Sequence, residues 1–241
     1  MTRREQRRLA FLRVSGWEHV QITPLAGDAS NRRYLRLTGN PDHRRAILMD
    51  ADPNTVGMQQ AFVEMASYLI DAGFSAPHIF AADLAQGFVL LEDFGDAVFA
   101  RMLVDAPAQE AALYRSAADC LAALHRQPAA KHLLQTTPDV LAKLIAPAFE
   151  WYAAKAAPDN TQNAQTATVA LLATSLQRHV PQCSVTVLRD FHAENLIWLP
   201  GRKGICRVGL LDFQDAVIGH PAYDLVSLTR DARRDLGPGV A

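Results

Sequence analysis

Alternating apolar and polar positions mark short segments in the first part of the chain. A period of two is typical of half-buried strands. The segments that show it lie at residues 20–22, 34–37, 46–49, 79–81 and 88–91. A helical period replaces it over residues 58–72, where Gly73 follows the last apolar position. Because glycine commonly follows the end of a helix, we expect one helix inserted among these strands.

Helical spacing dominates after residue 96. Apolar side chains there recur at intervals of three or four and form one stripe per segment. Segments of this kind lie at residues 108–126, 138–154 and 165–179. Residues 91–96 are acidic, contain a glycine and suit a hinge between two regions. We therefore predict an α+β chain with a strand-rich N-terminal lobe over residues 1–95 and a mainly helical C-terminal lobe over residues 96–241.

A pair of short strands is predicted near the end of the chain. Residues 196–199 and 208–211 are apolar, and residues 200–204, which include proline and glycine, are typical of the turn between them. In an antiparallel hairpin the first residue of one strand lies beside the last residue of the other. Asn195 and Asp212, which flank this hairpin, are therefore expected at the same end of it.

Asp190 lies five positions before Asn195, on the loop that leads into the hairpin. An aspartate, a following asparagine and a second aspartate after an apolar run are typical of kinase-type phosphoryl transfer. Asp190 would act as the base for the attacking hydroxyl, while oxygens of Asn195 and Asp212 would hold Mg²⁺. Either aspartate alone has a simpler explanation, because one can cap a turn and the other can end a strand. The occurrence of all three residues at this spacing favours phosphoryl transfer over these simpler explanations.

Composition limits the classes of function. The chain has 241 residues and a formal net charge of -1. It therefore lacks the excess of basic residues that is typical of proteins that bind nucleic acid or an anionic membrane. No segment approaches the length of a membrane span, and the basic residues 3–8 precede an apolar run too short for a signal peptide. Cys120, Cys183 and Cys206 are far apart, which favours free thiols in a reducing cytoplasm. We expect a cytoplasmic protein without an obligate protein partner.

Several segments together resemble a family of small-molecule kinases. They are the Leu-Leu-Glu-Asp hinge 90–93, the helix end 121–125, the loop 189–195 and the Asp-Phe-Gln-Asp run 212–215. These residues are similar to those of the aminoglycoside phosphotransferase/choline kinase group, and the likeness extends over nearly the whole chain. Residues 25–34 and 211–216 most resemble a bacterial branch that contains the anomeric N-acetylmuramate/N-acetylglucosamine kinases of cell-wall recycling. The resemblance implies a protein-kinase-like two-lobe fold with a small antiparallel-sheet N-lobe and a mainly helical C-lobe.

The resemblance also implies ATP and Mg²⁺ as cofactors. Asp190 matches the catalytic base of the family, and Asn195 and Asp212 match its metal ligands. Asp224 matches an aspartate that braces the catalytic loop from the following helix. Its position in the first turn of that helix also suits the helix dipole, and both interpretations can hold together.

The nucleotide loop of the family corresponds here to a small, polar segment. Small residues such as Gly27 let backbone N–H groups approach phosphate oxygens, and Ser30 and Asn31 can add side-chain donors. A surface turn of the same composition is the alternative, because the segment lacks a fixed glycine spacing. The resemblance further implies that the hinge backbone around Glu92 and Phe94 pairs with the adenine edge.

One position departs from the family pattern. The strand expected to carry a phosphate-pairing lysine has Met49 there, so Glu64 on the following helix loses its usual partner. Arg32 or Arg33, on the preceding loop and strand, could supply the positive charge, since guanidinium groups bind phosphate well. A solvated basic face explains these two arginines equally well.

The chain is also shorter than members of the family, which continue beyond the helix expected at residues 222–234. We expect part of the acceptor wall to lie beyond Ala241, so that this form binds ATP and Mg²⁺ but phosphorylates a sugar poorly. Leu225, Val226 and Leu228 would then present an apolar face that is not fully covered. Such a face would make the chain less stable or more prone to association.

The phosphate acceptor is expected to be a small hydroxylated molecule. Only eight residues separate Asp212 from Pro221, too few for the peptide-docking segment of a protein kinase. His192 and Asp215 are close enough in sequence to Asp190 to contact the acceptor, although His192 fits a structural loop histidine better. With the resemblance, this predicts a kinase for the anomeric hydroxyl of N-acetylmuramate/N-acetylglucosamine. The alternatives are a catalytically weak or silent kinase-fold nucleotide-binding module, or an aminoglycoside phosphotransferase.

Overall fold

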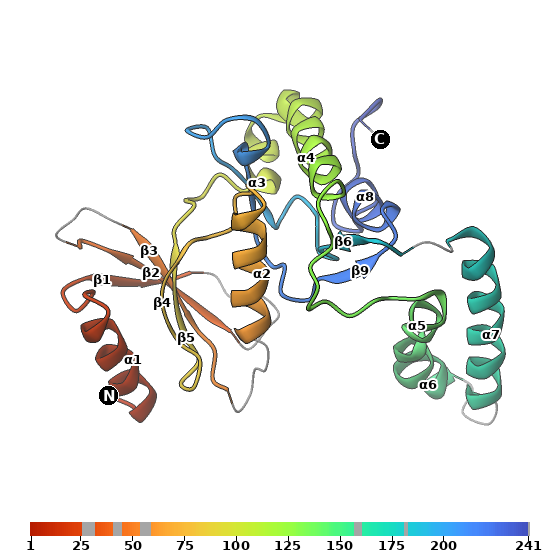
Figure 1. The fold of residues 1–241 in the computed structure, drawn as a ribbon, viewed down its shortest axis with the longest axis horizontal. Coiled ribbons are helices and arrows are strands. Elements are labelled where there is room, and N and C mark those ends of the chain that lie inside the picture. The colour runs from red at the N-terminus through yellow and green to blue at the C-terminus, as the bar shows by residue number, and fades with distance from the viewer. Residues whose placement is uncertain (26–31, 41–44, 54–58, 157–160, 181–182, 241) are drawn as a thin grey trace.

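A five-stranded antiparallel sheet forms the N-terminal part of the chain (Figure 1). The computed structural model describes residues 1–25, 32–40, 45–53, 59–156, 161–180 and 183–240. The strands are β1 Gln21–Pro24, β2 Arg33–Thr38, β3 Ala46–Asp50, β4 Ile79–Asp83 and β5 Phe88–Glu92. They lie in the order β1-β2-β3-β5-β4, so β3 and β5 are both inside the sheet. The strands predicted from the alternating pattern are all confirmed.

Each face of this sheet packs against one helix. Helix α1 (Arg3–Val14) and helix α2 (Gln59–Asp71) lie on opposite sides of the sheet (Figure 1). Buried apolar residues form two clusters, one on each face of the sheet. Neighbouring strand residues point to opposite faces, so Leu48 packs in the cluster beside α1 and Met49 in the cluster beside α2. Because both faces are covered, β3 and β5 are buried almost throughout.

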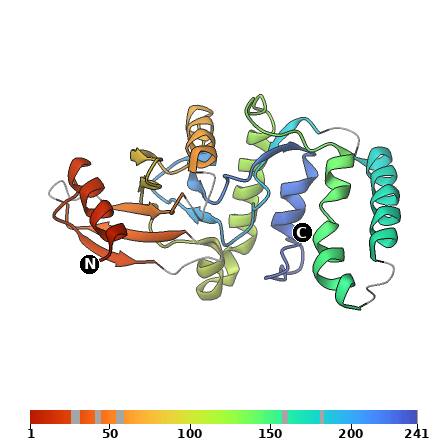
Figure 2. The same cartoon turned by 90° about the horizontal axis from the view of Figure 1, so that it is seen from below.

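Helices and two small ribbons form the rest of the chain. The helices are α3 Phe99–Asp105, α4 Glu110–Leu124, α5 Pro138–Lys143, α6 Ala154–Ala156, α7 Thr161–His179 and α8 Ala222–Thr229. The ribbons pair β6 Val185–Val187 with β9 Val217–Gly219, and β7 Leu196–Trp198 with β8 Val208–Leu210. Figures 1 and 2 both place α7 at the end of the molecule opposite α1. The predicted α+β arrangement of a sheet lobe and a helical lobe is confirmed, and the boundary at residue 95 stays a prediction.

The helix predicted over residues 138–154 is wrong as a single element. Helix α5 ends at Lys143, and a π-helical segment spans Ala148–Ala153. Pro147 lies between them, and a proline removes a backbone hydrogen-bond donor and clashes with the preceding turn. The interruption therefore has a local cause that the sequence contains.

The final predicted helix, over residues 222–234, is also too long. Helix α8 ends at Thr229, and Arg230 leaves the helical conformation with φ -129° and ψ 31°. The backbone N–H of Arg233 donates to the Oδ1 atom of Asp231 at 3.1 Å. Such a local bond from backbone to side chain competes with continuation of a helix.

The outer face of α8 is only partly covered by the rest of the chain. Leu228 is buried against the core, whereas Leu225 and Val226 are each about half exposed. This agrees with the expectation of an incompletely covered apolar face. None of the described helices is long and apolar enough to cross a membrane. The three cysteines are free thiols, as predicted.

Candidate active site

A buried carboxylate on α8 fixes the loop that carries Asp190. The side chain of Asp224 is fully buried and accepts two backbone hydrogen bonds, from the N–H of Leu188 at 2.6 Å and from that of Arg189 at 2.9 Å. The hydroxyl of Ser227, one turn further along α8, donates to the carbonyl oxygen of Arg189 at 3.1 Å. Arg189 is thus held from both sides by one helix, and the predicted bracing role of Asp224 is confirmed.

The bracing holds Arg189 in a conformation that is rare for a residue with a side chain. Its φ is 72°, in the left-handed region. Backbone strain of this kind persists only where surrounding contacts impose it, and it gathers at functional sites. The consequence here is a sharp turn immediately before Asp190, which fixes where that residue leaves the turn.

The carboxyl of Asp190 is partly buried beside a second carboxyl. Burial raises the pKa of Asp190, and the nearby charge of Asp212 raises it further. A raised pKa makes a carboxylate a stronger base and brings it closer to the range in which general bases work. This environment fits the role predicted for Asp190.

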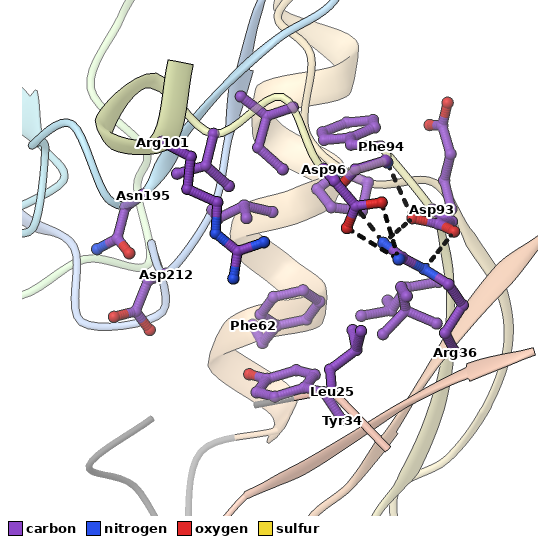
Figure 3. Close-up of a pocket in the computed structure, with 18 residues that line it drawn as sticks. Leu25, Tyr34, Arg36, Phe62, Asp93, Phe94, Asp96, Arg101, Asn195 and Asp212 are labelled. Carbon is purple, nitrogen blue, oxygen red and sulfur yellow. Dashed lines mark hydrogen bonds and ion pairs between the residues drawn. The ribbon is translucent and has the colours of Figure 1, made fainter. Parts of the chain in front are cut away.

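The hairpin that brings Asn195 and Asp212 together has the predicted register. Leu196 of β7 pairs with Leu210 of β8, and the N–H of Leu211 donates to the backbone carbonyl of Asn195 at 3.0 Å. Figure 3 shows the side chains of Asn195 and Asp212 at the same edge of the cleft. The hairpin was predicted from two short apolar segments and a turn, and the structure confirms the end at which these two residues meet.

The two oxygen-bearing side chains at this edge suit Mg²⁺. Asp212 has φ 56°, and its Oδ1 atom accepts a hydrogen bond from Nε2 of Gln214 at 2.7 Å. Within the described residues there is no cluster of three or more histidine, cysteine, aspartate or glutamate side chains that could hold a metal. Mg²⁺ does not need such a cluster, because it commonly takes one or two protein oxygens and completes its shell with phosphates and water. The donor set of Asn195 and Asp212 therefore fits this ion.

A cavity of about 320 Å³ separates the sheet from the helical lobe (Figure 3). Asn195 and Asp212 line one end of it, and the link between the lobes lines another part. Part of its apolar lining comes from β2, β3, β5, α2 and the residue after β1: Leu25, Tyr34, Ile47, Phe62 and Leu91. A flat apolar group can lie against such a wall while charged groups extend toward the end lined by Asn195 and Asp212.

The link between the lobes is fixed by an arginine on β2. Arg36 lies 2.8 Å from Oδ2 of Asp93 through Nε, and it donates to Oδ1 of Asp96 through Nη1, also at 2.8 Å (Figure 3). The side chain of Asp93 is 2% exposed, and its Oδ1 atom also accepts from the backbone N–H of Gly95. These bonds shape the link into a defined edge of the cavity.

The side chains of Glu92 and Phe94 are used to hold the lobes together. Glu92 pairs with Arg202 of the turn between β7 and β8, and Phe94 packs against Gly209 of β8. A methyl group added at Gly209 would lie 2.8 Å from a ring carbon of Phe94, so only glycine fits there. Both residues also line the cavity, and the predicted pairing of their backbone with the adenine edge stays a prediction.

One cationic side chain lies close to Asp212. Arg32, just before β2, is 8% exposed, and its Nη1 atom lies 3.8 Å from Oδ1 of Asp212. Arg33 is exposed on β2, so of the two arginines Arg32 is the one at the site. The predicted loop residues Gly27, Ser30 and Asn31 lie outside the described residues.

Arg101 was not singled out from the sequence. It lies in the third position of α3, and Figure 3 shows its guanidinium group pointing into the cavity. The available signal was a single basic residue in a short apolar helix directly after the acidic link. That pattern does not show which way the side chain points.

The position of the missing lysine is part of the apolar core. Met49 is fully buried with Phe62, which stacks on Phe213 at 5.0 Å between ring centroids. Glu64 on α2 accepts a hydrogen bond from Nε2 of Gln60 at 2.7 Å instead of facing β3. The family resemblance would place an ion pair of a lysine and a glutamate here. In this chain Met49 packs in the apolar core instead, and Glu64 bonds to Gln60 on the surface of α2.

The two predicted acceptor residues lie in different surroundings. Asp215 accepts from Nε2 of Gln214 at 3.3 Å, and its charge adds to the rise in the pKa of Asp190, so it lies near the base. The side chain of His192 is 7% exposed and lies behind the loop, with its Nε2 atom 3.3 Å from Nδ2 of Asn195. This placement favours the structural interpretation of His192.

The sequence matches known proteins over most of its length. The model of the phosphotransferase enzyme family matches residues 21–241. The N-acetylmuramate/N-acetylglucosamine kinase of Caulobacter vibrioides is 37% identical, over 98% of this chain and 74% of that protein. The protein of the same name from Pseudomonas aeruginosa is 33% identical, over 91% of this chain and 63% of that protein. The chain thus spans about three quarters of the first relative and under two thirds of the second.

The fold is similar to that of a solved aminoglycoside kinase. The structure of the gentamicin–APH(2″)-IIa complex matches with a TM-score of 0.71, over 100% of this chain and 79% of that one. The two sequences are only 14% identical, so the likeness shows the fold alone. It agrees with the protein-kinase-like two-lobe arrangement predicted from the sequence.

The buried carboxyl of Asp224 on α8 should make the stability of the chain depend on pH. Burial raises the pKa of Asp224 from 3.8 to about 6, although the two backbone N–H donors oppose the rise. Between these values the folded chain holds a proton that the unfolded chain has lost, so this contribution to stability falls as the pH rises. Relative to the Asp224→Asn variant, the wild-type free energy of unfolding should fall by about 3 kcal/mol across this window.

Denaturant unfolding of both proteins at a series of pH values measures this difference. A gap between wild type and Asp224→Asn that stays constant over the window would show that Asp224 does not titrate there. The opposite slope would show that the two N–H bonds outweigh burial.

Proposed function

This chain belongs to the phosphotransferase enzyme family, and from that premise we propose that it is an ATP-dependent sugar kinase. Its acceptor would be the anomeric hydroxyl of N-acetylmuramate/N-acetylglucosamine. The two relatives described above, which carry that name, support this choice over other acceptors. We place the nucleotide-binding lobe at residues 1–95 and the acceptor-binding lobe at residues 96–241. Use of ATP and three free cysteines support a cytoplasmic location.

The observation that carries the proposal is the meeting of Asp190, Asn195 and Asp212. Asp190 and Asp212 are close enough for the charge of one to raise the pKa of the other. Asn195 joins them through the hairpin, and its Nδ2 atom donates to the backbone carbonyl of Asp190 at 3.0 Å. A scaffold without phosphoryl chemistry has no need to hold a second carboxyl beside an amide and a carboxyl that line one end of a cavity.

The roles of these residues follow from the loose transition state of phosphoryl transfer, in which charge neutralisation and positioning matter most. Oxygens of Asn195 and Asp212 would hold Mg²⁺, which neutralises phosphate charge and orients the triphosphate. The carboxylate of Asp190 would accept the proton of the acceptor hydroxyl. Arg32, beside Asp212, and Arg101, which lines the cavity, would bind phosphate oxygens.

A nucleotide-binding module without turnover is the second candidate. Met49 favours it, because the strand lacks the cation that pairs with phosphates in related kinases. The two candidates differ in a single measurement. A kinase releases ADP in proportion to a phosphorylated sugar, whereas a silent module is stabilised by ATP and Mg²⁺ but forms no product with any acceptor.

Phosphorus NMR of the reaction products tests the proposed acceptor. The purified chain is incubated with ATP, Mg²⁺ and either N-acetylmuramate or N-acetylglucosamine. A signal split by the anomeric proton would identify a sugar 1-phosphate. Product formed only with an aminoglycoside would exclude the proposed acceptor, and ATP binding without any product would favour the silent module.

Replacing the base tests its role in the chemical step. The Asp190→Asn variant should turn over about a hundredfold more slowly or worse, because the amide cannot accept the proton of the acceptor. Its affinity for ATP should stay close to that of the wild type, since Asp190 contacts the acceptor and not the nucleotide. Steady-state kinetics and ATP titration measure both quantities. Near-normal turnover would remove Asp190 from this role.

The two proposed metal ligands should differ in importance. Asp212→Asn removes a negative charge, whereas Asn195→Ala removes a neutral oxygen, so the first change should raise the Mg²⁺ requirement for ATP binding more, by about tenfold or above. Calorimetric titration of ATP at several Mg²⁺ concentrations measures this. Equal losses that do not depend on Mg²⁺ would mean that both residues are structural.

The two arginines at the cleft are expected to share the role of the absent lysine. Arg32→Gln and Arg101→Gln should each weaken ATP binding about tenfold, the loss expected for one charged hydrogen bond. Arg33→Gln is the matched control, because Arg33 is the exposed neighbour of Arg32. Equal affinities of all three variants would place the phosphate-binding charge elsewhere.

A further inference from the structure

A buried polar contact lies behind the loop of Asp190 and involves a residue beyond α8. The Oδ2 atom of Asp231 lies 4.0 Å from the Nδ1 atom of His192. Both side chains are largely buried, with 4% and 7% of their surface exposed. In the part of the chain that the structure describes, neither of these two atoms has a hydrogen-bond partner. Two buried polar atoms that face each other in this way are expected to serve each other.

The position of Asp231 is set by contacts on both sides of it. Its Oδ1 atom accepts from the backbone N–H of Arg233 at 3.1 Å and from the Nη1 atom of the same residue at 3.0 Å. Three residues further on, Arg234 donates to Oε1 of Glu110 at 2.8 Å, and the N–H of Gly237 donates to Oε2 at 2.8 Å. These bonds tie the segment after α8 to the start of α4, and they leave Oδ2 of Asp231 for His192.

The contact determines which nitrogen of His192 carries the proton. A carboxylate oxygen only accepts, so the Nδ1 atom that faces it must carry hydrogen, and Nε2 then has a free lone pair. That lone pair faces the Nδ2 atom of Asn195 at 3.3 Å. The second hydrogen of Nδ2 goes to the backbone carbonyl of Asp190 at 3.0 Å. Both amide hydrogens of Asn195 are thereby used, so its oxygen is turned away from the loop.

We propose that Asp231 is a positioning residue that, through the proton on His192, holds the amide of Asn195 with its oxygen facing the cleft. The inference rests on the proposed function, in which this oxygen binds Mg²⁺. An asparagine amide can rotate by half a turn, and the rotated form would present an NH₂ group to the cation. Partners in an outer shell commonly fix the orientation of a metal ligand in this way.

The separation of 4.0 Å is longer than a hydrogen bond. Polar contacts at active sites are often long without substrate and shorten when the complex forms. The proposal therefore requires the proton to be on Nδ1 already without nucleotide and the contact to tighten when ATP and Mg²⁺ bind.

Nitrogen NMR of the histidine-labelled chain tests the first requirement without any activity. The chain has 8 histidines, and the His192→Leu variant assigns the signal of interest. In its neutral form, the imidazole of His192 should carry its hydrogen on Nδ1. This preference should persist in Asp231→Asn, which keeps an accepting oxygen, and disappear in Asp231→Leu. A proton on Nε2 in the wild type, or an unchanged tautomer in Asp231→Leu, would overturn the proposal.

A titration of Mg²⁺ tests the second requirement. Asp231→Leu should raise the Mg²⁺ concentration that half-saturates ATP binding about tenfold, the lower end of the losses found for outer-shell partners. Asp235→Leu is the matched control, because Asp235 is an exposed aspartate in the same segment. In the His192→Leu background, Asp231→Leu should not raise the Mg²⁺ requirement further, because Asp231 acts on Asn195 only through His192.

The two measurements separate the failure of this inference from that of the proposed function. If the wild type binds no ATP in a Mg²⁺-dependent manner, the proposed function is wrong and the NMR result still decides the role of Asp231 toward His192. If ATP binding is normal and Asp231→Leu shifts neither the tautomer nor the Mg²⁺ requirement, the inference alone is wrong. Thermal melting of each variant shows whether it folds, and Asp231→Asn provides the comparison if Asp231→Leu does not.

Discussion

The carboxylate of Asp224 is the contact on which the geometry of the site depends. It accepts the backbone N–H groups of two successive residues, Leu188 and Arg189, from inside the protein. Burying a charged group has a large free-energy cost unless hydrogen bonds compensate it, so the contact is maintained only where loop and helix meet in one arrangement. Any displacement of the loop would leave the carboxylate without donors. The position of Asp190 follows from this constraint, because it is the next residue in the chain.

The loop and the hairpin share a second property, since each contains a residue with a side chain in the left-handed region. Arg189 precedes Asp190 with φ 72°, and Asp212 itself has φ 56°. Both conformations are higher in free energy than those of a relaxed loop. Their effect is to bring two carboxyls close together in a partly buried place, which raises the pKa of Asp190. The strain and the altered pKa are thus two consequences of the same convergence, and α8 and the β7–β8 hairpin supply the rigid support for it.

Much of this arrangement could be predicted from the sequence, because local signals determine it. Alternation placed the strands, and hairpin register placed Asn195 beside Asp212. Long-range contacts were not visible in the same way. The segment after α8 is an example, because Asp231 faces His192 and Arg234 bonds to Glu110, both far away in the sequence. Arg101 was missed for a similar reason: helical spacing shows which residues share a face, but it does not show which face borders a cavity.

The replacement of a lysine by Met49 has a physical account in the packing of the sheet. Met49 of β3 is fully buried between the sheet and α2. An ammonium group there would need a partner that Glu64 does not offer, since Glu64 bonds to Gln60 on the surface of the helix. Methionine fills that space with apolar contacts instead. Phosphate charge can be neutralised from any direction within a few ångströms, so the cation need not come from the strand. Under the proposed function that charge would come from Arg32, beside Asp212, and from Arg101, which lines the cavity. A guanidinium group is less strongly hydrated than an ammonium group. The sheet lobe thereby keeps an apolar interior while the rim of the cleft carries the charge.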